Sequence, residues 1–375
     1  MLGPSPTDST SSSLLMRRPR IAFYSDASHL GGAEVVLAEL VHGLTSEFRV
    51  SVLATRAAVL EHLTDGQAGI AAELLPPVRN KGDLAGLVRH RRVIERMGAD
   101  VFHANLSMPT SCQYAILAAS SVRGLKLVGV ENSPVWSRRA SAAWLKRLAS
   151  ARLDAHVAVG ERTARTVESE AGLPPGSIRV INPGIADRGV AEQRSWAEPV
   201  VIGTVARLWR VKGVDVVIDA VARLAGVRLI VVGDGPEEES LRAQIRRLGL
   251  EGRTELRSVP FDGTARDLIG SFDIFALGSR QEGFPVTVME AMFAAVPVVA
   301  TDAGSVREQV VDGETGLVVA AEDPAALAGA LERLAGDRDL RERMGRAGRR
   351  RAHERFTVDR MVSAYERLYV ELLAT

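Results

Sequence analysis

"VVIGTVARLWRVKGVDVVIDAVARLAGVRLIVVGDG", residues 200–235, decides the fold class of this chain. It begins and ends with short apolar runs, 200–205 and 227–232, in which β-branched residues predominate. Such runs are typical of strands that are buried on both faces, and the apolar residues of 214–226 recur at helical spacing between them. A strand, a helix and a second strand form a βαβ unit, which builds parallel sheets covered by helices.

The same alternation continues along the rest of the chain. In the first half, the predicted strands are 20–25, 49–55, 100–105, 126–132 and 154–160. In the second half, they are 200–207, 227–235, 254–260, 273–279 and 297–304. A single sheet of ten or more strands would be unusual, so the pattern favours two sheets.

The boundary between the two sheets is expected in the polar, Gly- and Pro-containing stretch 182–199. The predicted fold is therefore α/β, with two Rossmann-like doubly wound domains at 18–188 and 196–356 that face each other across a cleft. The Ser- and Pro-rich residues 1–17 are predicted to be a disordered tail, and 357–375 a C-terminal helix. Ligands of such sheets bind beyond the carboxyl ends of the strands, at the point where the strand order reverses.

Composition excludes several classes of protein. The chain has 375 residues, 46% of them apolar, and a formal net charge of +1, which argues against a protein that coats polyanions. It has one cysteine, Cys112, so no internal disulfide and no cysteine-based metal site can form. No apolar run approaches the roughly 20 residues that span a bilayer, and no signal peptide is recognised. The predicted location is the cytoplasm.

Two glycines follow the first predicted strand at the start of a helix. In "DASHLGGAEVV", residues 26–36, Gly31 and Gly32 let backbone N–H groups approach an anion with no side chain in between. Glu34 falls in the first turn of the helix, where the helix dipole favours a carboxylate. The pattern is not G-x-G-x-x-G, so the dinucleotide fingerprint is absent. An anion-binding turn and a plain tight turn both remain open interpretations.

Two cations, Arg207 and Lys212, flank the loop that follows the strand at 200–205. At the carboxyl end of a parallel strand they suit a diphosphate, with arginine as a planar fork and lysine as a point charge. A solvated loop with incidental charges is the alternative interpretation. Gly233, in the turn "VVGDGP" at 231–236, is a weaker candidate at the end of the next strand.

Two carboxylates lie eight positions apart in "SRQEGFPVTVMEA", residues 279–291. Pro285 suits the first position of a helix, so Glu282 lies just before the helix and Glu290 near its second turn. Carboxylates accept hydrogen bonds from pairs of sugar hydroxyls, and this spacing suits a nucleotide sugar from its hexose to its ribose. A capped helix with one solvated acid is the simpler alternative.

Together these motifs resemble the retaining glycosyltransferases of family 4, which have the GT-B fold. The resemblance rests on the E-x7-E pattern of "EGFPVTVME" (282–290) and on "GTVARLWRVKG" (203–213), which is similar to the family's G-R-L…K-G segment. It extends to "GGAE", "VVGDGP", "DAGSVREQV" (302–310) and "DGETGLVV" (312–319). It covers essentially the chain from residue 20 onward and is most specific in the second half.

The resemblance implies a role for each matched residue. Glu290 is expected to bind the ribose hydroxyls, and the catalytic set is Arg207, Lys212 and Glu282. Of these, Glu282 would bind the donor sugar, while the two cations would hold the diphosphate and stabilise the leaving group. The remaining donor contacts are expected from Gly31, Gly32, Gly233, Gly283, Phe284, Pro285 and Val286. No metal is expected at this site.

The resemblance also assigns the domains and shows where this chain departs from the family. The first domain would bind the acceptor and the second the nucleotide sugar, and the C-terminal helix would cross back to the first domain. Family members commonly carry a histidine after the strand that corresponds to 126–132, where this chain has Glu131 and Asn132. His103 and Asn105, at the end of an earlier strand, are further acceptor-side candidates, although His103 equally suits a packed or capping side chain. A second departure is Ser305, where the family often has glycine.

The predicted function is transfer of a hexose-type sugar from a nucleotide-diphosphate donor to an acceptor hydroxyl, with retention of the anomeric configuration. A UDP-sugar is favoured over a GDP-sugar. The alternatives are a nucleotide-sugar epimerase or phosphorylase on the same fold, and a non-catalytic nucleotide-sugar-binding protein. Free release of an altered nucleotide sugar would distinguish the epimerase.

The expected partners are a nucleotide sugar, as co-substrate rather than cofactor, and a small-molecule, glycan or lipid-linked acceptor. The basic segment at 341–355 is interleaved with acids, which favours a solvated helix over nucleic-acid binding. The basic segment "LVRHRRVIERM", 87–97, is interpreted as an ordinary surface helix, with peripheral membrane contact at the inner face as its alternative. High Ala and Arg usage is consistent with a bacterial source.

Overall fold

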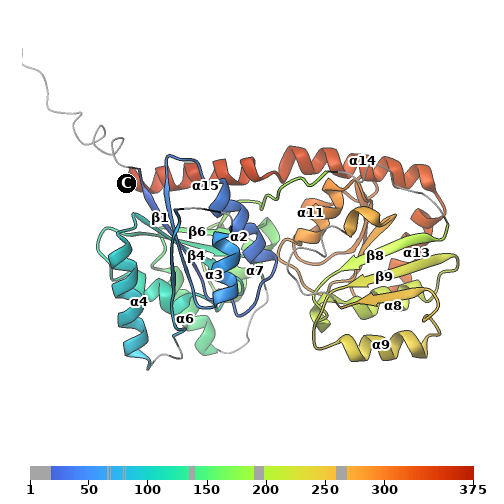
Figure 1. Ribbon diagram of the computed structural model, residues 1–375, viewed down its shortest axis with the longest axis horizontal. Helices are drawn as coiled ribbons and strands as arrows, with labels where there is room; N and C mark the ends of the chain where they lie inside the picture. Colours follow the sequence, from blue (N-terminus) through green and yellow to red (C-terminus); the bar gives the residue numbers. More distant parts are fainter. Residues whose placement is uncertain are drawn as a thin grey trace, which may run out of the picture.

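The structure is a computed structural model that describes residues 18–65, 67, 69–78, 80, 82–134, 140–189, 198–258 and 268–375. Two parallel sheets, each covered by helices, lie side by side as two domains (Figure 1). The predicted pair of Rossmann-like doubly wound domains is therefore confirmed. The tail at 1–17 and residues 190–197 of the predicted linker lie outside the described residues.

The first sheet has seven parallel strands in the order β3-β2-β1-β4-β5-β6-β7. Its strands are β1 Arg20–Ser25, β2 Arg49–Ala54, β3 Ala71–Leu74, β4 Val101–Leu106, β5 Lys126–Glu131, β6 Ala155–Ala158 and β7 Arg179–Val180. Its helices are α2 Gly32–Gly43, α3 Ala57–Thr64, α4 Leu84–Met97, α5 Gln113–Ala119, α6 Ala140–Ser150 and α7 Glu161–Ala171. The strand order reverses between β1 and β4, so the loops after these strands border the crevice.

The second sheet has six strands in the order β10-β9-β8-β11-β12-β13, and its reversal lies between β8 and β11. Its strands are β8 Val200–Val205, β9 Val227–Val232, β10 Thr254–Arg257, β11 Ile274–Leu277, β12 Val298–Thr301 and β13 Gly316–Val319. Its α-helices are α8 Val214–Val221, α9 Glu238–Arg247, α11 Val286–Phe293, α12 Val306–Gln309, α13 Pro324–Ala335 and α14 Arg338–Arg355, and two 3₁₀ turns are η1 Arg210–Lys212 and η2 Ile269–Ser271.

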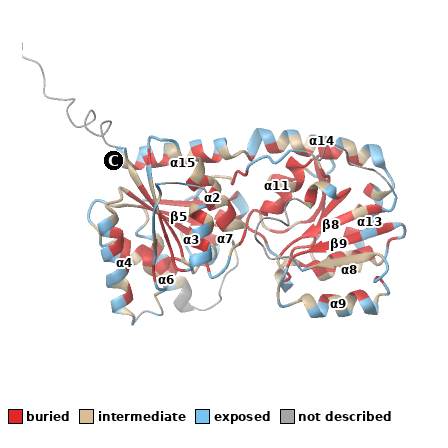
Figure 2. Cartoon of the chain, in the orientation of Figure 1, coloured by how far each residue is buried: buried red, intermediate tan, exposed pale blue. Residues whose placement is uncertain are grey.

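The strands at the centre of each sheet are buried, as continuous apolar runs require (Figure 2). Three strands were not predicted: β3, β7 and β13. The residues of β3 are mostly exposed, and β7 has two residues, so neither carries the apolar run of a central strand. All three lie at or next to a sheet edge, where burial on both faces is not required.

The last helix, α15 (Val358–Leu373), leaves the second domain and packs on the first (Figure 1). Its apolar face joins the core between α2 and the first sheet through Met361, Tyr365 and Tyr369. The linker crosses beside it, because the backbone N–H of Ile185 donates to the carbonyl of Phe356 at 3.0 Å. The two chain crossings between the domains therefore lie next to each other.

A further contact joins the domains on the side of α7. The carboxylate of Glu308, in α12, accepts the backbone N–H groups of Glu161 and Arg162 at 2.8 and 2.9 Å. These residues open α7, whose own N-cap residue, Gly160, has no side chain to offer. The side chain of Arg162 also pairs with Asp302 at 2.6 Å. The second domain thus caps a helix of the first.

Candidate active site

The loops that follow β8 and β11 bring a lysine and a glutamate together at the carboxyl edge of the second sheet. Lys212 ends the short η1 turn, and its Nζ donates to both carboxylate oxygens of Glu282 at 2.8 Å. The Oγ of Ser279 donates to the same carboxylate at 2.7 Å. The Glu282 side chain is 6% exposed, so its charge requires these partners.

Arg207 follows β8 and points toward the first domain. One guanidinium N–H donates to Nε2 of His29, in the loop after β1, and the guanidinium lies 5.3 Å from the ring centroid of Trp209. Partial burial lowers the pKa of Arg207, while the carboxylates of Glu282, Glu34 and Asp234 act in the opposite direction. Arg207 of the second domain is therefore close enough to interact with carboxylates of both domains.

The turn after Glu282 leads into α11. The helix begins at Val286, so Pro285 is its N-cap residue rather than its first helical residue, a correction of one position. Glu290 is the fifth residue of α11 and is partly buried, unlike its helical neighbours Met289 and Ala291, which are fully buried. The structure therefore places Glu290 on the helix that starts at this turn, five residues beyond Pro285, the N-cap residue.

Three predicted donor residues lie directly against the first domain or the core. A Cβ at Gly283 would come within 1.9 Å of the carbonyl oxygen of Asn132, so only glycine allows this approach. Val286 occupies the space beside Gly32, where an added Cβ would lie 3.0 Å from its Cγ2. Phe284 is buried, with its ring 5.5 Å from that of Phe356. Val286 thus packs where the two domains meet, and Phe284 packs in the core.

The predicted glycine turns lie at the expected sheet edges. Gly31 is the N-cap residue of α2, and its carbonyl accepts the N–H of Glu34 at 3.1 Å. Gly233 follows β9 and lies against the carbonyl of Ala206, where an added Cβ would come within 1.9 Å. The turn at Gly233 is thus packed closely against main chain, whereas a Cβ added at Gly31 would meet only a carboxylate oxygen of Glu34, at 3.4 Å.

A row of polar side chains crosses the carboxyl edge of the first sheet. The Nδ2 of Asn132 donates to Oδ1 of Asn105 at 2.8 Å, and Nδ2 of Asn105 lies 3.5 Å from Oε1 of Glu34. The Oγ of Ser25 lies 3.4 Å from the same Glu34 oxygen. Burial raises the pKa of Glu34 to about 7, although hydrogen bonds and the charge of Arg207 oppose the shift. This row faces the second domain at Gly283.

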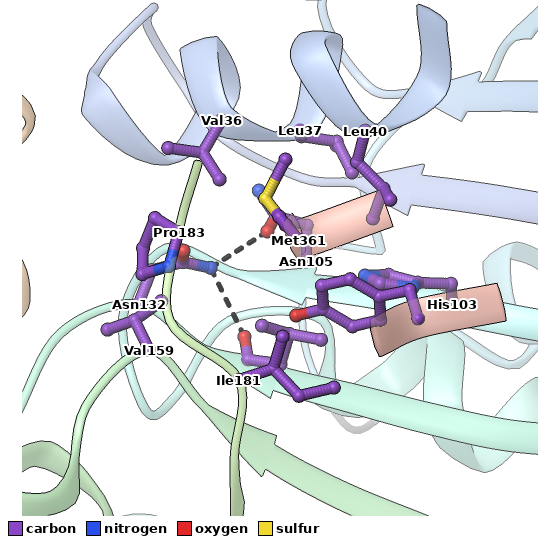
Figure 3. A pocket seen from close by; sticks show the side chains of 12 residues that line it. Val36, Leu37, Leu40, His103, Asn105, Asn132, Val159, Ile181, Pro183 and Met361 are labelled. Atoms are coloured by element: carbon purple, nitrogen blue, oxygen red, sulfur yellow. Dashed lines mark hydrogen bonds between the residues drawn. The ribbon is translucent and has the colours of Figure 1, made fainter. Parts of the chain in front are cut away.

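Beside this row, a small cavity of about 10 Å³ lies between α2, the ends of β4 and β5, and α15 (Figure 3). Asn105 and Asn132 meet at it, and His103 lies deeper, where its Nδ1 is 2.7 Å from the hydroxyl of Tyr369. His103 is 1% exposed, and burial lowers its pKa to about 3. Of the two interpretations of His103, its surroundings match the packed side chain.

Glu131 ends β5 but is directed into the domain rather than toward the cleft. It is fully buried and pairs with the ammonium of Lys146 and with Nε2 of His156, the latter at 2.6 Å. Burial would raise the pKa of Glu131, but the positive charge of Lys146 and the His156 hydrogen bond outweigh it and lower the pKa. These contacts fix α6 to the sheet, and they hold the Glu131 carboxylate in a buried ion pair.

Sequence patterns missed two aromatic residues of this site, His29 and Trp209, whose rings lie 6.0 Å apart. Glu34 was expected only to complement the helix dipole. For His29 and Glu34 the sequence contains one signal, which is that they flank the paired glycines after the first strand. Among the described residues, no three His, Cys, Asp or Glu side chains gather as metal ligands, and no helix is long and apolar enough to cross a membrane.

Family models match both halves of the chain. Residues 30–188 match the model described as Glycosyltransferase Family 4, and residues 190–351 match Glycosyl transferases group 1. The lipopolysaccharide core biosynthesis mannosyltransferase LpsB of Rhizobium meliloti is 30% identical over 256 residues, which cover 63% of this chain and 71% of LpsB. The chain belongs to the group 1 and family 4 glycosyltransferases. The predicted family is confirmed.

Further proteins are similar to this chain in sequence or in fold. The lipopolysaccharide core biosynthesis glycosyltransferase LpsE of R. meliloti is 31% identical over 172 residues, 46% of this chain and 50% of LpsE. The chain spans half or less of the length of three of the relatives that it matches. HepE of Anabaena, solved in complex with UDP-glucose, superposes with a TM-score of 0.79 over 94% of this chain and 99% of HepE, at 22% identity. The GT-B fold is thus shared over 94% of this chain.

Proposed function

We propose that this glycosyltransferase-family protein moves a hexose-type sugar from a nucleotide-diphosphate donor to an acceptor hydroxyl, with retention of the anomeric configuration. The observation that carries the proposal is the convergence of Arg207, Lys212 and Glu282 at the switch point of the second sheet, opposite the switch point of the first. Ligands of doubly wound sheets bind at such points. A UDP-sugar is the favoured donor, and HepE, which shares the fold, binds UDP-glucose.

The cations suit the departure of a diphosphate. The Lys212 ammonium has three donors, so it can keep one bond to Glu282 and direct another at a phosphate oxygen. Arg207 offers a planar fork that can replace its contact with His29 by phosphate oxygens. Positive charge placed where negative charge develops lowers the barrier, and the surrounding low dielectric strengthens the effect.

The carboxylates suit the hydroxyl groups of the donor. Glu282 accepts hydrogen bonds and would hold the donor sugar, while Glu290, on the helix that follows, would hold the ribose. The acceptor oxygen would bond to the anomeric carbon on the face that the diphosphate leaves, and the acceptor's proton would pass to the leaving oxygen. Contact between Gly283 and Asn132 would exclude water from the reacting groups.

The acceptor is proposed to bind against the first domain, at the polar row of Glu34, Asn105 and Asn132. This proposal replaces Glu131 and His103 in that role, because one is committed to a buried ion pair and the other to Tyr369. The amide groups can donate to and accept from hydroxyls, as an alcohol acceptor requires.

The test is a turnover assay with UDP-, GDP- and ADP-sugars and a panel of acceptor alcohols, followed by NMR of the products. We expect release of the nucleoside diphosphate together with a new glycosidic bond that keeps the donor's anomeric configuration. Conversion of the nucleotide sugar into a different nucleotide sugar would identify an epimerase instead. Binding without any turnover would identify a non-catalytic binding protein and contradict the proposal.

A further inference from the structure

The structure places a histidine of the first domain against the arginine that the proposed function assigns to the diphosphate. His29 lies in the loop between β1 and α2, and its Nε2 is in hydrogen-bond contact with Arg207 of the second domain. The two residues are 178 positions apart in the sequence. Trp209 lies next to both, with its ring 6.0 Å from the His29 ring. The three side chains thus converge at the cleft from opposite sides.

The contact defines the protonation state of the imidazole. A guanidinium group can only donate hydrogen bonds, so Nε2 of His29 must accept, and the ring must be neutral. The proton then resides on Nδ1, which lies 2.9 Å from the hydroxyl of Ser28. The lone pair of His29 thus occupies a guanidinium N–H of Arg207 that could otherwise bond to a phosphate oxygen.

A bound diphosphate reverses these requirements. Phosphate oxygens accept hydrogen bonds, so they replace the His29 lone pair as partner of Arg207. The Nε2 of His29 then faces an oxygen that can only accept, so Nε2 bonds to it only when it carries a proton. Histidine can take up that proton near neutral pH, because its ordinary pKa is close to 6.5.

We propose that His29 is a proton-linked ligand of the donor diphosphate. When the nucleotide binds, the His29 imidazole takes up a proton from solvent at Nε2, and this N–H donates a hydrogen bond to a phosphate oxygen. This inference rests on the proposed function of the site. His29 would be the first domain's side-chain contact to the diphosphate, and it would tighten the contact between the domains only when the donor is present.

The surrounding charges agree with proton uptake. Burial, and then the charge of Arg207, lower the pKa of His29 in the structure, whereas Asp234, in the loop after β9, acts in the opposite direction. A diphosphate would add negative charge beside the imidazole and raise its pKa. Between the lowered and the raised pKa, each binding event takes up a proton, so affinity falls as pH rises through that window.

The experiment is calorimetric titration of UDP, GDP and ADP into the full chain, repeated from about pH 6 to about pH 8 in two buffers with different ionisation enthalpies. The variants are His29→Gln, which cannot be charged, and His29→Lys, which keeps a charge throughout. His42→Gln, at the far end of α2, is the matched control. Any pH dependence of affinity that remains in His29→Gln comes from titration of the phosphate itself.

As pH rises over this range, we expect the nucleotide affinity of the wild type to fall by about tenfold more than that of His29→Gln. Binding to the wild type should also take up a proton, and binding to His29→Gln should not. His29→Lys should bind without the extra pH dependence, and His42→Gln should follow the wild type. Equal pH dependence and equal proton uptake in wild type and His29→Gln would overturn the role of His29 while leaving the donor site intact. If none of the nucleotides binds, the donor site and the role of His29 are both contradicted.

Discussion

The ammonium of Lys212 bridges both oxygens of the Glu282 carboxylate, at 2.8 Å each. The two residues come from loops after different strands, β8 and β11, which are neighbours in the sheet although 70 positions separate them. The pair therefore couples the group proposed to hold the diphosphate to the group proposed to hold the sugar. A donor must therefore compete with an ion pair in which the charges of Lys212 and Glu282 already neutralise each other.

Lys212→Gln should lower kcat by about 100-fold to 1000-fold, because one positive charge no longer stabilises the leaving group. The Ser279 hydroxyl still donates to Glu282, so the second domain should keep its fold. The measurement is steady-state turnover of the donor identified by binding. Lys126→Gln, in the first domain and away from the cleft, serves as control. Wild-type kcat in Lys212→Gln would remove the lysine from the mechanism.

Glu34→Gln should change how stability depends on pH. The folded-state pKa of Glu34 is raised to about 7, so ionising this carboxyl costs free energy only in the folded protein. Stability of the wild type should therefore fall as pH rises from about 4.5 to about 7, by an amount on the order of 3 kcal/mol. The amide variant lacks this loss, so it should be the more stable protein at about pH 8.

Urea unfolding of the wild type and Glu34→Gln at low and high pH measures this difference. Glu61→Gln, on the exposed side of α3, controls for general charge effects. If the two proteins lose stability in parallel as pH rises, the buried carboxyl is not the titrating group.

Glu308→Gln should weaken the contact between the domains. A charged carboxylate caps the first two N–H groups of α7 across the interface, and a neutral amide accepts more weakly. We expect the free energy of unfolding to fall by about 1 kcal/mol, the usual value of a helix cap. Glu314→Gln, in the exposed turn before β13, should leave stability unchanged. Identical denaturation curves for wild type and Glu308→Gln would show that the cap contributes nothing.

Gly283→Ala should separate nucleotide binding from turnover. The three nearest atoms to an added Cβ all belong to Asn132 and Ser133 of the first domain, so the second domain alone has room for it. Nucleotide affinity should stay within about threefold of wild type while turnover falls by at least about tenfold, because the domains can no longer meet. Gly329→Ala, where an added Cβ meets nothing within 4 Å, is the matched control. Normal turnover in Gly283→Ala would contradict a need for this contact.

The fold followed from the sequence because central parallel strands must be buried on both faces, as β8 and β11 are. Edge strands have no such requirement, which explains why β3, with mostly exposed residues, carried no recognisable pattern. The loops of the second domain were also predictable, since Arg207, Lys212 and Glu282 each lie at a strand end within a short motif.

The first domain's share of the site was not predictable in the same way. Glu131 looked available because it follows a buried strand, yet its partners Lys146 and His156 come from α6 and β6. His29 has no motif of its own, and its importance appears only when the fold sets Arg207 beside it. Contacts between residues far apart in sequence depend on how the two domains meet, which no local pattern encodes.

The most direct test of a nucleotide-sugar site is calorimetric titration of UDP, GDP and ADP into the wild type and Glu290→Ala. Glu290 is partly buried on α11, so its loss should remove the ribose contact without disturbing the fold. The account predicts saturable binding of one nucleotide by the wild type, weakened at least about tenfold in Glu290→Ala, in line with the loss of hydrogen bonds to a charged group. Failure of the wild type to bind any of the three, or equal affinity in both proteins, would contradict it.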